Sequence, residues 1–323
     1  MDPDIEELTD AQSIKQSNEK IMAQILASDD GEVKFASAAG SKMIRRRIRE
    51  EGFTRRIITP QTATNDMLDR ALEHDKPIII EDMEPDSPAA KSIPFGDSAD
   101  IQFYYGNKFA NVFNEITTPE FTKDINELRS YRMDLRQVQT DNALKDVHTE
   151  EDGQFIGMVD RIVGAHNGVG ASGKQQHFKW TGGITRDNYV DALSVLEDHD
   201  LNNGVFLCNR KTAKEFLKFR RDELGGDLSE EAFKRGLPAL AEGTVMGVKH
   251  IITIKRALVP DWVVYCFTEE DYLGRFFELQ ALTLYVKKEK NQLSFSARET
   301  LAVTIANVAG VAKIDFGGKR AAG

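Results

Sequence analysis

Residues 76–105 read KPIIIEDMEPDSPAAKSIPFGDSADIQFYY, and this stretch decides the fold. The run Ile78, Ile79, Ile80 predicts a strand, and residues 100–105 predict a second strand that returns beside it. The segment between them is rich in proline and acidic residues. A two-stranded ribbon with such a long polar tip is not stable alone in water, and long irregular segments are usually functional or held by something else. We therefore expect a partner subunit to hold this segment.

A long amphipathic helix is predicted next. Thr118 is a good N-cap, and Pro119 suits the first helical position. The apolar residues that follow at steps of three or four are Phe121, Ile125, Leu128, Tyr131, Leu135 and Val138. We expect a helix of about 25 residues, near 37 Å long, which is more than most globular domains use. Such a helix would serve as a spine.

From about residue 165 the pattern changes to shorter α/β alternation. Tyr189 and its apolar neighbours predict a helix capped by Thr185, and residues 205–208 predict a buried strand. Asn209 ends that strand and can cap the next helix. Further strands are predicted over residues 248–254, 262–267, 279–286 and 293–305, and a last motif covers residues 307–316. These elements indicate an α+β fold.

Composition excludes several classes of protein. Of 323 residues, 41% are hydrophobic and 29% charged, which is typical of a globular chain, and a net charge of −10 argues against a dedicated nucleic-acid reader. Cys208 and Cys266 lack metal or redox spacing, so we expect buried thiols in a reducing compartment. No run of 18 apolar residues and no apolar signal core are present. We expect an intracellular product that does not span a membrane.

One string resembles a phosphate-binding loop. It runs from Gly168 through Gly170 and Gly173 to Lys174. Gln175 stands where the magnesium-binding hydroxyl is needed, and glycines shortly downstream leave no room for the helix that such a loop requires. We interpret the string as a surface loop.

Other candidates for chemistry have ordinary explanations. The acids of residues 150–152 and 269–271 are predicted at helix starts, where they favour the helix dipole. The six histidines have no metal-binding spacing, and neither cysteine lies near a recognisable base. The sequence therefore predicts no catalytic, cofactor-binding or metal site.

A basic stretch closes residues 1–55, which are predicted to form an N-terminal arm with only a thin apolar stripe. Its arginines allow three interpretations: a solvated helix face with internal ion pairs, a contact with nucleic acid, or a contact with the acidic segment of a neighbouring subunit. We favour the third, because neither segment is stable alone. The predicted interface residues are Arg45, Arg46, Arg47, Arg49, Glu81, Asp82, Glu84 and Asp86.

The order of these elements resembles the major capsid proteins of tailed bacteriophages, which have the Hong Kong 97-type fold. The resemblance covers residues from about 40 to 317. The stretches that carry it are residues 76–105, residues 118–147, Asn209-Arg210-Lys211-Thr212-Ala213, and Arg298-Glu299-Thr300-Leu301 through Asp315-Phe316. It implies an N-terminal arm (1–55), an extended β-ribbon loop (76–106), a peripheral domain with the spine helix (56–75, 107–164 and 276–318) and an axial α/β domain (165–275).

The resemblance also implies a function. The chain would be a structural subunit and not an enzyme, assembling as hexamers and pentamers into the icosahedral head of a virion around double-stranded DNA, without sequence-specific binding. Assembly in the host cytoplasm, a separate scaffolding protein, a portal and decoration proteins are further expectations. The alternatives are a bacterial encapsulating shell protein, which shares the fold, a nucleotide-binding protein using the glycine loop, and a nucleic-acid-binding protein using the basic arm.

Overall fold

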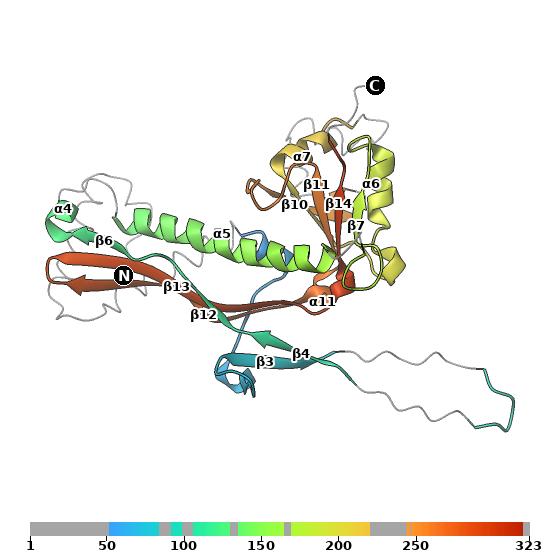
Figure 1. Cartoon of the computed structure of the whole chain (residues 1–323), viewed down its shortest axis with the longest axis horizontal. Coiled ribbons are helices and arrows are strands. Elements are labelled where there is room, and N and C mark those ends of the chain that lie inside the picture. Colours follow the sequence, from blue (N-terminus) through green and yellow to red (C-terminus); the bar gives the residue numbers. More distant parts are fainter. Residues whose placement is uncertain are drawn as a thin grey trace, which may run out of the picture.

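A long helix, a curved hairpin, a sheet-and-helix unit and a narrow ribbon make up the molecule (Figure 1). The computed structural model describes residues 52–83, 92–98, 106–129, 135–164, 169–219, 244–245 and 247–318. The long helix, α5, runs along the hairpin, the sheet-and-helix unit stands at one end of this helix, and the ribbon points away from both (Figure 1).

The hairpin belongs to a five-stranded sheet that α5 (Leu135–Val163) covers. The strands are β1 (Gln61–Thr62), β5 (Asn114–Thr117), β6 (Phe121–Asp124), β12 (Gly274–Glu289) and β13 (Gln292–Ile305). β12 and β13 pair antiparallel along most of their length, β1 lies parallel to β12, and β5 and β6 both pair with β13. Val147, Phe155 and Val159 of the helix share one buried core with Leu284 and Leu301 of the hairpin. The predicted spine is therefore a helix that packs along a sheet.

The predicted start of the spine helix is wrong. Residues that follow Thr118 form β6 and the short helix α4 (Ile125–Arg129), and α5 begins only at Leu135. Thr118 is not a helix N-cap: its backbone nitrogen donates to Ala297 O, and Ala297 N donates to its Oγ1, both at 2.9 Å. Hydrogen bonds to the edge of β13 hold this segment beside that strand, so it does not form the predicted helix. At its other end, α5 continues to Val163.

The second sheet has six strands between two layers of apolar side chains. Its order is β7 (His177–Lys179), β14 (Val311–Asp315), β11 (Val263–Phe267), β8 (Val205–Asn209), β10 (Val248–Thr253) and β9 (Thr244–Val245). All five residues of β11 are buried, as expected for a strand covered on both faces. Tyr265 and Phe267 join the core beneath α5, whereas the alternate residues Val264 and Cys266 join a second core with helices α6 (Arg186–Leu193) and α7 (Arg210–Phe216). The sheet therefore attaches this unit to the spine.

Local predictions for this unit are confirmed. Thr185 caps α6 by accepting a hydrogen bond from Asn188 N at 3.2 Å. Asn209 ends β8 and caps α7, because its Oδ1 accepts from the backbone nitrogens of Lys211 and Thr212 at 2.9 and 2.8 Å. One boundary differs from the prediction: the range 276–318 was assigned to the peripheral domain, but β14 within it is a strand of the six-stranded sheet.

The third sheet is the ribbon. It contains β2 (Asp69–Arg70), β3 (Pro77–Asp82) and β4 (Lys108–Val112), paired antiparallel in that order. The predicted strand over residues 77–80 is confirmed as part of β3. The predicted returning strand over residues 100–105 lies outside the described residues, and the strand that follows β3 in the sequence and pairs with it is β4. Ile79 and Phe113 anchor the ribbon to Phe277 and Ala302 of the hairpin.

Both cysteines lie inside the six-stranded unit. Cys208 on β8 and Cys266 on β11 are free and buried, which confirms the prediction of buried thiols. Burial raises the pKa of Cys208 to about 12 and also raises that of Cys266. Among the helices described, none combines the length and the apolar character needed to cross a membrane.

Candidate functional site

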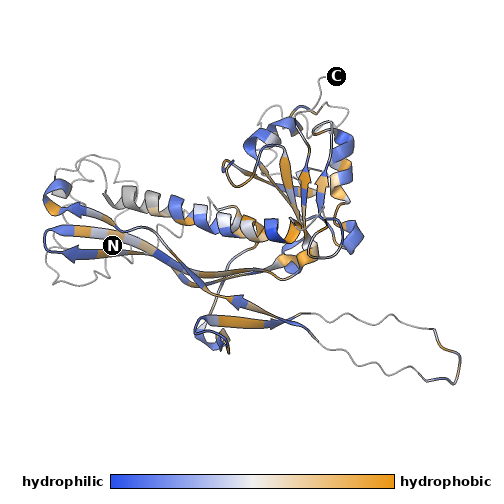
Figure 2. Cartoon of the chain, in the orientation of Figure 1, coloured by the Kyte–Doolittle hydropathy of each residue, from blue (hydrophilic) through white to orange (hydrophobic). Residues whose placement is uncertain are grey.

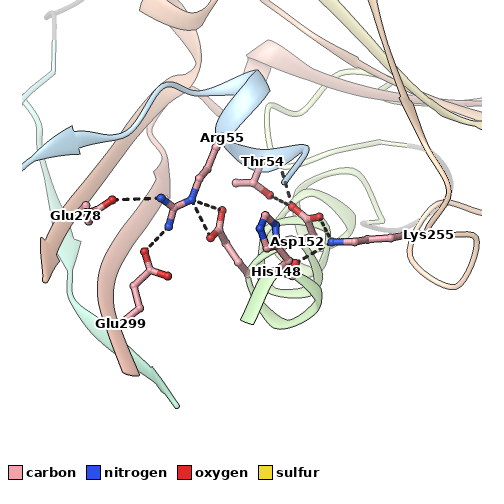
Figure 3. A network of polar contacts seen from close by, with 8 residues as sticks. Thr54, Arg55, His148, Asp152, Lys255, Glu278 and Glu299 are labelled. Carbon is pink, nitrogen blue, oxygen red and sulfur yellow. Dashed lines mark hydrogen bonds and ion pairs between the residues drawn. The ribbon is translucent and has the colours of Figure 1, made fainter. Parts of the chain in front are cut away.

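The most distinctive polar site lies where the described chain begins. The short helix α3 (Thr54–Ile57) inserts its first two side chains between the spine and the hairpin (Figure 3). Thr54 and Arg55 are both buried, although a threonine and an arginine are ordinarily exposed. Buried polar groups of this kind need partners, and the surrounding elements supply them.

Arg55 is held by three carboxylates from three elements. Its Nε donates to Glu151 Oε2 on α5 at 3.1 Å, and Nη1 donates to Glu278 Oε2 on β12 at 3.1 Å. Nη2 donates to Glu299 Oε1 on β13. The guanidinium carbon also lies 5.1 Å from the ring centre of Phe276, within range of a cation–π contact. One side chain thus ties α3 to the spine and to both strands of the hairpin (Figure 3).

Three carboxylates of this cluster contact one guanidinium. Burial raises the pKa of Glu151 to about 8; the charge of Arg55 opposes this shift, while the charges of Glu299 and Asp152 add to it. Burial alone would lower the pKa of Arg55, but the three carboxylates outweigh it and hold that pKa above its ordinary value. The cluster therefore favours retaining one proton at neutral pH.

A second set of contacts adjoins the first through Thr54. Asp152 Oδ1 accepts from Thr54 N at 3.0 Å and from Thr54 Oγ1 at 2.7 Å, while Oδ2 accepts from Lys255 Nζ at 2.6 Å. His148, one turn earlier on α5, is buried, and neither of its ring nitrogens has a hydrogen-bond partner within the described ranges. Burial and then the charges of Lys255 and Arg55 lower the pKa of His148 to about 3, so its imidazole is neutral.

Sequence reasoning missed this site. Residues 150–152 were predicted at a helix start, but they lie in the middle of α5, and Glu151 and Asp152 are buried. The helical spacing held a usable signal, because Val147, Glu151 and Phe155 are four residues apart on one buried face. For residues 269–271 the prediction is confirmed, since Glu270 and Asp271 occupy the first turn of α11 (Glu270–Leu273).

The structure describes only two of the predicted interface residues. Glu81 lies 3.6 Å from Arg275 and accepts a hydrogen bond from Asn111 at 3.1 Å, and Asp82 lies 3.5 Å from Lys108. The carboxylate of Asp82 remains 80% exposed, so its ion pair is of the weak surface type. The other residues of the predicted interface lie outside the described residues: Arg45, Arg46, Arg47, Arg49, Glu84 and Asp86. The structure therefore leaves the pairing of the two segments a prediction.

The glycine loop has the geometry of a tight turn. Gly170 N donates to Lys174 O at 2.9 Å, and Lys174 Nζ reaches the backbone oxygen of Asp198. The loop leads into the strand β7 and not into a helix, so it lacks the helix N-terminus that a phosphate-binding loop uses. Gly168 lies outside the described residues. Within the described ranges, no group of three or more potential metal ligands comes together.

Comparison with known proteins bears on the fold. No protein-family model and no curated protein matches the chain. Solved structures do match: the capsid of a native GTA particle gives a TM-score of 0.57 at 15% identity, covering 82% of this chain and 89% of that one. Mycobacterium phage Che8 gives 0.54 at 13% identity over 79% and 92%, and the mature capsid of bacteriophage PhiM1 gives 0.53 at 9% over 75% and 82%. The chain has the Hong Kong 97-type capsid fold.

The predicted α+β class and the resemblance to tailed-phage capsid proteins are thereby confirmed at the level of fold. Within this Hong Kong 97-type chain, the Arg55 cluster lies where α3, the spine helix and the hairpin meet. A buried junction of this kind holds elements together.

Proposed function

We propose that this chain is the major capsid protein of a tailed phage, assembling as hexamers and pentamers into the icosahedral head around double-stranded DNA. The observation that carries the proposal is the capsid fold itself, which accounts for at least three quarters of this chain and more than four fifths of each capsid protein compared. The role is structural and not enzymatic. No observation on the described residues favours the nucleotide-binding or nucleic-acid-binding alternatives.

Apolar side chains on the ribbon support self-assembly. Leu72 and Phe95 are fully exposed, although large apolar residues usually lie in a core. Met67, Ile80 and Ile93 in the same part of the molecule are also exposed. The ribbon reaches away from the body, and its tip includes apolar positions (Figure 2). Exposed apolar side chains at the tip of a projecting ribbon are suited to a contact with another subunit, and a copy of the same chain is the partner that a shell requires.

The domain assignment follows from the proposed function. Residues 1–55 would be the arm, 76–106 the extended loop, 56–75 and 107–164 with 276–310 the peripheral domain, and 165–275 the axial domain. Because β14 pairs with β11, we place residues 311–315 with the axial domain. A separate scaffolding protein, a portal and decoration proteins would be the further partners, in a virion assembled in the host cytoplasm.

The oligomeric state tests the function. We would measure the mass distribution of the full chain by analytical ultracentrifugation and image any heavy fraction by electron microscopy. Species of five or six times 36.2 kDa, or closed shells, are expected. In a matched variant, Phe95→Ser should reduce these species without changing the thermal midpoint of the dissociated subunit, because Phe95 buries no surface within the subunit. A chain that stays monomeric and binds DNA with a steep salt dependence would contradict the proposal.

We also propose that the arginines of the arm pair with the acids of a neighbour's extended loop. Complementary charge on two segments that cannot be stable alone supports this, and Asp82 has an exposed carboxylate to offer. Changing Arg45, Arg46 and Arg47 to Glu should impair assembly, and changing Asp82, Glu84 and Asp86 to Lys in the same chain should restore it. If the second set of changes restores nothing, the pairing is wrong.

A further inference from the structure

The loop between β10 and β11 meets both the spine and α3. Lys255 in this loop donates through Nζ to Asp152 Oδ2 at 2.6 Å and to the backbone oxygen of His148 at 3.1 Å. The same ammonium lies 5.9 Å from the ring centre of Phe53, the residue before α3. One cation of the six-stranded unit therefore contacts the spine, as Figure 3 shows, and also Phe53, which is distant from the spine in sequence.

Asp152 takes part in the contacts with both Thr54 and Lys255. It is fully buried, and both of its oxygens are used: Oδ1 accepts two hydrogen bonds from Thr54, and Oδ2 accepts from Lys255. A carboxylate held on one side cannot rotate without losing the partner on the other side. The orientation that Thr54 imposes is therefore the orientation in which Asp152 meets Lys255 (Figure 3).

Apolar packing reinforces the same junction. Val259, in the same loop, is fully buried and belongs to the core that contains Phe53 and Ile57. Leu258 packs against the spine at Gly153, where an added Cβ would lie 3.7 Å from its Cδ2. The backbone nitrogens of both loop residues donate to Lys255 O at 3.1 Å, so the loop folds around the lysine that Asp152 holds.

We propose that α3 is a coupling element: Thr54 positions Asp152 for Lys255, so the seating of α3 on the spine and the attachment of the 254–262 loop to the spine stabilise each other. A displacement of α3 would then loosen the six-stranded unit from the helix, although the two are far apart in sequence. The coupling is a property of the single subunit and does not depend on the proposed capsid function. If the coupling is observed in a chain that stays monomeric, the coupling is supported, and the proposed capsid function is still decided by the assembly experiment.

Amide hydrogen exchange on the full chain tests the coupling in both directions, because coupling between two sites is reciprocal. Thr54→Val, which removes the hydroxyl, should speed exchange at Leu258 and Val259 about tenfold, the factor expected for one hydrogen bond to a charged group. Thr54→Ser keeps the hydroxyl and should restore the slow exchange. Lys255→Met should speed exchange at Ile57 and Ile58, whose amides close α3.

A second ion pair provides the matched control. Lys313 on β14 lies 2.8 Å from Asp160 and also joins the six-stranded unit to the spine, away from α3. Lys313→Met should therefore leave exchange at Ile57 and Ile58 unchanged. If Thr54→Val and Lys255→Met each speed exchange only beside the substituted residue, or if Lys313→Met matches Lys255→Met, the coupling is refuted. Amide exchange in Lys255→Met is measured separately from that in Thr54→Val. If Thr54→Val unfolds the whole chain, the Lys255→Met measurement still tests the coupling.

Discussion

Replacing Arg55 by Met tests whether the buried guanidinium stabilises the fold. Methionine retains an unbranched stem against the ring of Phe276, but leaves Glu151, Glu278 and Glu299 without their shared cation. Removing one partner of a buried ion pair typically costs about 3–5 kcal/mol. We expect the lower end, about 3 kcal/mol, because Glu151, with a pKa of about 8, can stay protonated. At roughly 2 °C per kcal/mol, the thermal midpoint should fall by about 6 °C.

The assay is thermal unfolding of dissociated subunits at pH 7, followed by circular dichroism. Arg70→Met is the matched control, because the Arg70 side chain is 88% exposed and lies 3.8 Å from Asp75. It should change stability by less than about 0.5 kcal/mol. Adding Glu299→Gln to Arg55→Met should recover part of the loss by removing a carboxylate. The reasoning is refuted if the Arg55 and Arg70 variants unfold at the same temperature.

Three further predictions concern two buried titratable groups and two glycines. Glu151 has a pKa of about 8 in the folded chain and an ordinary value of 4.5, so the free energy of unfolding should fall as pH rises between these values. Glu151→Gln should make the urea midpoint depend less on pH over this range. His148 has a folded pKa of about 3 against 6.5, so stability should be lost as pH falls through that window, and His148→Leu should remove this part of the acid sensitivity. Gly157→Ala in α5 should raise the free energy of unfolding by about 0.5–1 kcal/mol, because no atom lies within 4 Å of the new Cβ. Gly274→Ala should lower it by about 1–3 kcal/mol, because its Cβ would overlap Thr304 O. Equal denaturation midpoints for the two glycine variants would contradict the last of these.

Local signals allowed correct predictions where a residue's partners lie nearby in sequence. Thr185 and Asn209 cap helices through amides two or three residues away, so composition and position are enough to find them. The buried strands β8 and β11 were found from short apolar runs. A long helix was expected from residue 118, but of the apolar residues that predicted it only Leu135 and Val138 lie in α5.

The sequence by itself determined the α+β class and the caps and buried strands of the six-stranded unit, because hydrophobic spacing and capping chemistry act over a few residues. The tertiary structure alone decided the rest. Thr118 does not start a helix because Ala297, distant in sequence, forms two hydrogen bonds with it. Arg55 is buried because carboxylates from α5, β12 and β13 converge on it. A buried charge is stable only where its partners meet, and which partners meet depends on how the whole chain packs.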